Sequence, residues 1–211
     1  HQIRKKAFSK FLKTGFPTQK WEDWRFTDLS HLKKQSYQIS DGLDDPVTII
    51  DRSTYKMEGV ETIVIHNGHY QKALSSHHDG IRVLTGPKYI NERSGQIKTT
   101  ADDPFDLLNT AFMDSCLSLM IDRNINLTTP VRILVISSGI DPIMVSPRVY
   151  VDINESSSAT LIEHYLGDAT STFQNSSLIF SIAENSHLDH IRIQSNPVSA
   201  QYVANLNVSL Y

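Results

Sequence analysis

The sequence has one cysteine, few glycines and no long apolar run. Because Cys116 has no second cysteine within the 211 residues, a disulfide-stapled secreted scaffold is excluded. The longest apolar stretches, such as Ile133 to Ile136, are much shorter than the ~18 residues of a membrane helix. Nine glycines and eight prolines are scattered along the chain, which excludes a collagen-like sequence. We therefore expect a globular, cytoplasmic protein whose core is built from its 39% hydrophobic residues.

Lysine is also missing from the second half, since none follows Lys98. Residues 1–40 carry a net charge of +6, residues 41–110 carry −4 and residues 111–211 carry −5, which together give −3. This division indicates two regions of different character. The sequence begins at His1 rather than Met and ends at Tyr211 within a strand-like pattern, so we expect it to be part of a longer protein.

Residues 1–110 predict an N-terminal helical and α+β region. Apolar residues of 2–13 recur at helical spacing opposite four basic residues, and Thr27 or Asp28 is a suitable cap for a short helix through Leu32. Short strand-like runs follow at 47–50, 62–66 and 80–84, with turn signals such as Asn67-Gly68 between them. A second helical pattern covers 103–120, where Asp103 before Pro104 predicts the N-cap.

Residues 111–211 predict a β region. Strand-like runs lie at 117–121, 131–137, 148–153, 159–166, 177–182, 188–194 and 202–211, with Asn, Ser, Asp and Pro between them. Short strands with polar corners fit either a β-sandwich or a β-solenoid. Because no fixed repeat is visible, the pattern alone favours the sandwich slightly.

Histidine pairs raise the possibility of a metal site. His66 and His69, and likewise His187 and His190, have ligand-like spacing, and His77-His78-Asp79 is a compact triplet. Positions i and i+3 of a strand face opposite sides, however, and one cysteine with such pairs does not assemble a tetrahedral site. We therefore predict surface or turn histidines, no metal site and no catalytic residue.

Three other chemistries compete with simpler interpretations. Five carboxylates of the β region (Asp152, Glu155, Glu163, Glu184 and Asp189) fit either a carbohydrate-active β-helix lyase or hydrolase or, as we favour, solvated charges at strand edges and corners. Cys116 is expected to be a buried small hydrophobe rather than a reactive thiol. The basic first helix fits a solvated face better than a nucleic-acid site, since the sequence pI is 6.3.

The aromatic segment after the first helix is more specific. Gly15-Phe16-Pro17-Thr18, Lys20, Glu22, Trp24-Arg25, Thr27 and Leu29 resemble the N-terminal signature of SufD-like members of the SufB/SufD family. Similar segments follow in the family's order at 64–70, 105–114, 130–133, 159–165 and 184–194. The order and spacing of these segments, from about residue 3 to 211, carry the resemblance. Cys116 departs from it, because the family usually has glycine there.

The resemblance implies a fold and a function. It implies an α+β region over 1–110 followed by the start of a right-handed parallel β-helix over 111–211, mainly β overall, which displaces the sandwich. It also implies a non-enzymatic scaffold of iron–sulfur cluster assembly, working in the cytoplasm with a SufB-like paralogue and a SufC-like ABC-type ATPase. The cluster is then handled by the whole complex. The family's cluster and ATPase-docking residues correspond to positions after Tyr211, so none is assigned here, and an incomplete β-helix is expected to self-associate through its end.

Overall fold

A computed structural model describes residues 2–39, 56–76, 79–85, 103–113, 116–139, 142–167 and 171–211. The described helices are α1 (Gln2–Thr14), α2 (Ser30–Lys34) and α5 (Pro104–Phe112), with 3-10 turns η1 (Glu22–Trp24) and η3 (Lys72–Leu74). The strands are β1 (Gln38–Ile39), β2 (Glu61–His66), β3 (His69–Tyr70), β4 (Ile81–Thr85), β5 (Cys116–Ile121), β6 (Val131–Ser137), β7 (Ile143–Val145), β8 (Arg148–Ile153), β9 (Ser158–Gly167), β10 (Thr172–Ile182), β11 (His187–Ser195) and β12 (Gln201–Leu210). The strand expected at 47–50 lies outside the described residues.

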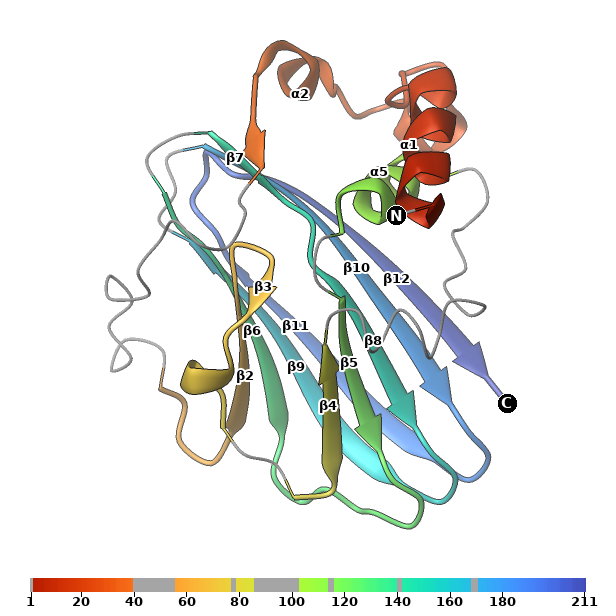
Figure 1. Ribbon diagram of the computed structural model, residues 1–211, viewed down its shortest axis with the longest axis vertical. Helices are drawn as coiled ribbons and strands as arrows, with labels where there is room; N and C mark the ends of the chain where they lie inside the picture. The colour runs from red at the N-terminus through yellow and green to blue at the C-terminus, as the bar shows by residue number, and fades with distance from the viewer. Residues whose placement is uncertain are drawn as a thin grey trace.

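The strands form two facing sheets of a parallel β-solenoid (Figure 1). One sheet has the order β1-β7-β10-β8-β5-β4, with β12 also paired to β10, and the other has the order β11-β9-β6-β2-β3. The chain passes from one sheet to the other at β5–β6, β8–β9 and β10–β11, and each strand pairs in parallel with its equivalent in the next coil. The solenoid implied by the resemblance is confirmed, and the sandwich favoured by the strand pattern is wrong.

The coils differ in length, which hides the repeat in the sequence. Ile125 donates its backbone N–H to the Ser157 hydroxyl across 32 positions of the sequence. At the same corner of the next coil, the Ser157 backbone N–H donates to the Ser186 hydroxyl across 29 positions. Equivalent residues are therefore not spaced at a fixed period, although the strands of successive coils lie in register.

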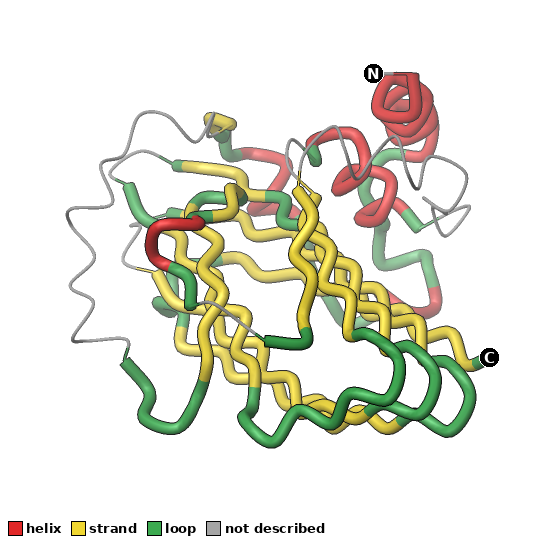
Figure 2. The backbone as a smooth tube through the Cα atoms, turned by 60° about the horizontal axis from the view of Figure 1, so that its bottom comes forward, coloured by secondary structure: helices red, strands yellow, loops and turns green. Residues whose placement is uncertain are grey.

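One corner of the coils repeats more strictly than the sequence does. Asn124, Ser156 and Asn185 all have left-handed backbone conformations, with φ of 61°, 58° and 56°. Next to them, the Ser157 hydroxyl donates to the carbonyl of Asp122 at 2.7 Å, and the Ser186 hydroxyl donates to the carbonyl of Asn154 at 2.7 Å. Figure 2 shows the loops at this corner of successive coils stacked on one another. These serines connect each coil to the preceding one.

The two ends of the solenoid differ. At the first coil, β4 pairs antiparallel with β5, and β3 folds back on β2 through the expected Asn67-Gly68 turn, where both φ values are positive. At the other end, β12 continues the register of β10, and its Leu206, Val208 and Leu210 lie beside the luminal residues of β10. These three side chains are 41%, 52% and 75% exposed. Antiparallel strands thus cover one end, while apolar side chains remain exposed at the other.

The helices pack on the outside of the first sheet. The lumen, the space between the two sheets, is filled by alternate residues of the strands, such as Val149, Val151 and Ile153 of β8. A second apolar cluster joins α1, α2 and α5 to Phe173 of β10. Because β2 and β4 also belong to the solenoid sheets, part of the region predicted over 1–110 is built into the solenoid. The domain boundary at residue 110 stays a prediction.

Helix α5 is shorter than the sequence pattern predicts. The expected cap is confirmed, since the Asp103 carboxylate accepts the Asp106 backbone N–H at 2.7 Å and Pro104 occupies the first turn. The helix ends at Phe112, however, and the predicted continuation to Met120 is wrong. Residues from Cys116 instead pair with β4 and β8, because these side chains complete the apolar lumen.

Candidate functional site

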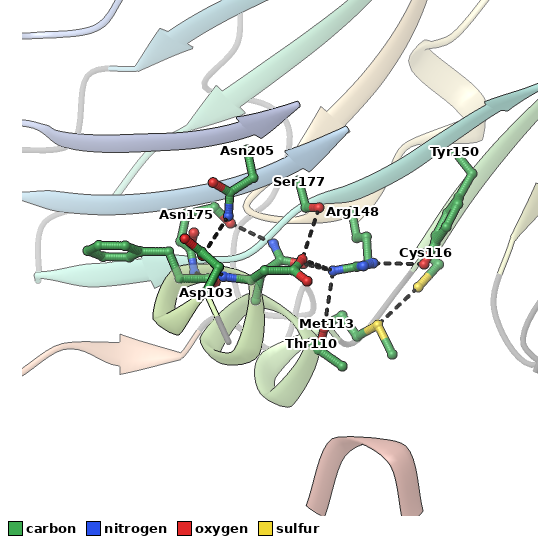
Figure 3. A network of polar contacts seen from close by, with 12 residues as sticks. Asp103, Thr110, Met113, Cys116, Arg148, Tyr150, Asn175, Ser177 and Asn205 are labelled. Carbon is green, nitrogen blue, oxygen red and sulfur yellow. Dashed lines mark hydrogen bonds and ion pairs between the residues drawn. The ribbon is translucent and has the colours of Figure 1, made fainter. Parts of the chain in front are cut away.

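A buried ion pair connects α5 to the solenoid (Figure 3). The Nη1 of Arg148 donates to the carboxylate of Asp106 at 2.9 Å, and both side chains are 1% exposed. The same nitrogen lies 3.0 Å from Asn109 Oδ1 and 3.2 Å from Thr110 Oγ1. The Nε of Arg148 donates to the Tyr150 hydroxyl at 2.8 Å. The guanidinium thus has partners on one helix and on its own strand.

The alternation of β8 explains why a charged residue is buried there. Since Val149 and Val151 fill the lumen, Arg148 and Tyr150 face outward. Helix α5 covers Arg148, and Tyr150 packs against Met113 and Cys116. Burial lowers the pKa of Arg148, but the nearby Tyr150 and Asp106 outweigh this effect and raise it above its ordinary value. The side chain is therefore a permanent cation whose role is to hold α5 on the sheet.

Two side-chain amides extend the connection between α5 and the solenoid to the neighbouring strand β10. The Asn109 amide donates to the carbonyls of Pro147 at 3.0 Å and Asn175 at 2.7 Å. In return, the Asn175 amide donates to the carbonyl of Phe105 at 2.8 Å. Both residues are fully buried, and the bonds run from the helix to β10 and to Pro147, which directly precedes β8. The network is structural, since its polar groups bond to one another, although the buried Oδ1 of Asn175 has no hydrogen-bond partner among the described residues.

A second buried polar cluster lies inside the lumen, around Glu163. The Nε of Arg192 donates to Glu163 Oε2 at 2.6 Å, and its Nη2 to Oε1 at 3.2 Å. His190 Nε2 lies 2.9 Å from Oε1, and the Tyr165 hydroxyl donates to Oε2 at 2.9 Å. The carboxylate is 1% exposed. Because an ionised carboxylate only accepts, the proton between His190 and Glu163 is on the histidine nitrogen.

The electrostatics of this cluster keep Glu163 ionised. Burial raises the pKa of Glu163, but hydrogen bonds from His190 and Arg192 outweigh burial, so the pKa lies below its usual value. Burial raises the pKa of Tyr202, on the neighbouring strand β12, to about 12. The Tyr165 and Tyr202 rings are in contact, with centroids 4.8 Å apart. The cluster is an internal ion pair that links β9 to β11, and Tyr165 extends it to β12.

Cys116 is buried, as expected. It is 1% exposed, and its Sγ lies 3.5 Å from the sulfur of Met113. Burial raises the pKa of the thiol to about 11, although Arg148 and Arg4 act in the opposite direction. A thiol with this pKa is almost entirely protonated near neutral pH, so it is neither a ready nucleophile nor a ready metal ligand.

The fold separates His187 from His190, whereas His66 and His69 are cross-strand neighbours in the β2–β3 hairpin. His66 Nε2 lies 2.7 Å from the Ser138 hydroxyl and His190 binds Glu163, whereas His187 pairs with Asp189 at the surface at 3.3 Å. Among the described residues, no group of three or more His, Cys, Asp or Glu side chains is arranged to hold a metal ion. His77 and His78 lie outside the described residues.

The five carboxylates do not form an acid–base pair. Glu155 pairs with Arg123 at 2.6 Å at a corner, and Glu184 and Asp189 are exposed. Asp152 is buried on the outer face of β8, whereas Glu163 faces the lumen from the other sheet. The prediction of solvated charge is therefore wrong for Asp152 and Glu163. An inward position opposite Arg192 explains the burial of Glu163.

Sequence reasoning missed both buried clusters, although one left a signal. In β9, Ala159, Leu161 and Tyr165 face the lumen, and Glu163 occupies the same face. A carboxylate in an apolar alternation requires a cationic partner. The Arg148–Asp106 pair has no such local signal, because Arg148 is on the outer face of its strand, where a charged residue does not break the apolar alternation.

Comparison with known proteins agrees with the fold. The family model described as the SufBD protein N-terminal region matches residues 1–133 of this chain. An iron–sulfur cluster assembly SufBD family protein of Synechocystis sp. is 26% identical over 208 residues, covering 89% of this chain and 46% of that protein. The iron–sulfur cluster assembly protein SufD of Escherichia coli is 27% identical over 201 residues, covering 92% of this chain and 46% of that protein. The chain thus spans slightly under half the length of these two relatives.

None of the described helices is long and apolar enough to cross a membrane. The matched region extends from α1 into β6, and so includes the helices packed outside the solenoid and its first coil. Together with the solenoid itself, the match over more than half of the chain identifies the family. The chain belongs to the SufBD family of iron–sulfur cluster assembly proteins, and its sequence is SufD-like.

Proposed function

We propose that this chain is the N-terminal part of a non-enzymatic scaffold component of a SufBCD-type iron–sulfur cluster assembly complex. The match of residues 1–133 to the SufBD N-terminal region carries the proposal. Its partners are a SufB-like paralogue and a SufC-like ABC-type ATPase, and its compartment is the cytoplasm. The cluster is the cargo of the complex, and the single, buried cysteine of this chain does not hold it.

The geometry of the two buried ion pairs supports a scaffold role for the chain. The two buried ion pairs have their charges satisfied inside the protein, at the α5 junction and in the lumen. Charged groups that are already paired inside the protein make the fold more rigid and are not available to react with a substrate. A carbohydrate-active β-helix is less well supported, because Asp152 and Glu163 face opposite sides of their sheets.

Affinity purification of the full-length protein from its own cells tests the proposal. We expect an ABC-type ATPase and a SufB-like protein to co-purify, with iron and sulfide in the isolated complex after anaerobic handling. A protein ending at Tyr211 is the matched control, and it is expected to lose the ATPase. Isolation of the full-length protein without any ATPase, together with release of reducing ends from a polysaccharide, would overturn the scaffold role.

A further inference from the structure

The exposed flank of α1 has an unusual composition for a helix packed on a core. Ala7 and Phe11 of this helix are buried against α5. Phe8 and Leu12, one turn apart, remain 40% and 65% exposed. Lys5 is also exposed and lies one turn before Phe8 on the same flank. Two large apolar side chains and a cation are thus presented together.

A cavity lies beside this flank. It has a volume of about 300 Å³ and is lined by Arg4, Lys5, Phe8, Ala111 and Phe112. The Phe8 and Phe112 rings meet edge to face, with centroids 5.7 Å apart, and form its apolar wall. Arg4 donates from Nε to the Ala111 carbonyl at 3.0 Å, which holds its guanidinium at the rim. The cavity therefore combines an aromatic wall with two cationic side chains.

We propose that this surface, formed by Lys5, Phe8 and Leu12 with the adjoining cavity, is a docking site for an acidic amphipathic helix of a partner protein. Apolar anchors one turn apart on the partner would contact Phe8 and Leu12 and enter the cavity. Acidic residues beside these anchors would pair with Lys5 and Arg4. Arg4 and Lys5, which line the cavity without a carboxylate among its described lining residues, supply the charge complementarity.

Two other occupants fit the surface less well. A membrane requires a continuous apolar helix face, and the main apolar face of α1 is already used against α5. Nucleic acid requires an extended cationic surface, whereas here the two cations, Arg4 and Lys5, lie beside the exposed apolar side chains of Phe8 and Leu12. The proposal does not depend on iron–sulfur cluster assembly, since the surface is argued from its own side chains.

Fluorescence anisotropy with the full chain tests the proposal. The probe is a short fluorescein-labelled peptide with leucine and phenylalanine on one helical face and glutamate and aspartate on the other. We expect binding that weakens as salt rises, and a loss of about tenfold in affinity for Phe8→Ala and for Lys5→Glu. Leu12→Ser is expected to weaken binding as well. Because Leu12 is largely exposed, this variant separates binding from folding.

Lys6→Glu is the matched control, because Lys6 is exposed on the opposite flank and the change in net charge is the same. It is expected to change the affinity by less than about threefold. Equal losses of affinity for Lys5→Glu and Lys6→Glu would show that the peptide responds only to the overall charge of the protein, and would overturn the proposal. Absence of peptide binding, or tighter binding to a DNA duplex or to phosphatidylserine vesicles, would also overturn it.

Discussion

Glu163 and Cys116 show how burial acts differently on two ionisable side chains. The carboxylate is surrounded by Arg192, His190 and Tyr165, so it remains charged in an apolar lumen. The thiol lies beside the weakly polar sulfur of Met113, and burial keeps it neutral. The compensating donors, rather than the depth of burial, decide the charge state.

Replacement of Glu163 by glutamine should destabilise the protein by about 2 kcal/mol at neutral pH, because Arg192 loses its carboxylate. The folded pKa lies below the ordinary value of 4.5, so the ionised group stabilises the fold above this value. That stabilisation is lost as the pH falls through the folded pKa. The difference between the melting temperatures of the two proteins, measured from pH 7 to 3, should therefore begin to shrink below about pH 4.5 and continue to shrink toward the folded pKa.

Glu155→Gln provides the comparison for this experiment. Glu155 pairs with Arg123 at the surface, where the two side chains are 44% and 66% exposed, and its removal should cost less than about 1 kcal/mol. A difference between wild type and Glu163→Gln that stays constant across the pH range would show that the carboxylate is not ionised in the lumen.

The thiol of Cys116 should react slowly in the folded protein. A pKa of about 11 and 1% exposure predict alkylation by iodoacetamide at pH 8 at least about 100-fold slower than in the unfolded chain. The same protein in denaturant is the control, since its sequence contains one cysteine. Similar rates in both conditions would contradict the burial of this thiol.

Among the secondary structure elements, α5 depends on the buried pair between Arg148 and Asp106. Arg148→Met should cost about 3–5 kcal/mol, because it leaves a buried carboxylate without its cation. The double variant Arg148→Met with Asp106→Leu should be more stable than the single one, since no charge of this pair remains buried. Urea denaturation followed by circular dichroism measures both. A single variant as stable as the double one would contradict the pairing.

The strands also show what sequence patterns can predict. The strands predicted at 131–137 and 148–153 are β6 and β8 with these bounds, because apolar residues dominate both. The pattern does not predict the first half of β10, since Thr172, Gln174 and Asn175 are polar although all are buried. Asn175 donates to a carbonyl of α5, and this contact exists only in the folded chain. Hydrogen bonds between residues far apart in the sequence leave no periodic pattern, so the strand pattern does not predict them.

For the molecule as a whole, the chemistry of the interior is harder to predict than the architecture. Resemblance leads to the solenoid, whereas the clusters around Arg148 and Glu163 depend on which coils become neighbours. The length of one coil brings Arg192 next to Glu163 from 29 positions away in the sequence. A pattern read within one strand does not contain that information.

The exposed luminal residues of β12 should make the chain self-associate. Val208 and Leu210 are 52% and 75% exposed beside a paired strand, so a second copy can cover them. Light scattering over a range of concentrations should show dimers or larger species, and Val208→Lys with Leu210→Lys should reduce them. Phe26→Lys, at a residue 88% exposed outside the solenoid, is the control. A monomer at all concentrations would contradict this prediction.

The serine corners have a mechanical consequence. Ser157 and Ser186 each fasten one coil to the preceding coil, so the solenoid is held together by successive, similar connections. Under tension applied to its ends, such a chain should open one coil at a time from β12 inward. Each step should release about 30 residues, or roughly 100 Å of extended chain. The antiparallel strands at the first coil should resist longest, because pulling must break both β3 and β4 away from their partners.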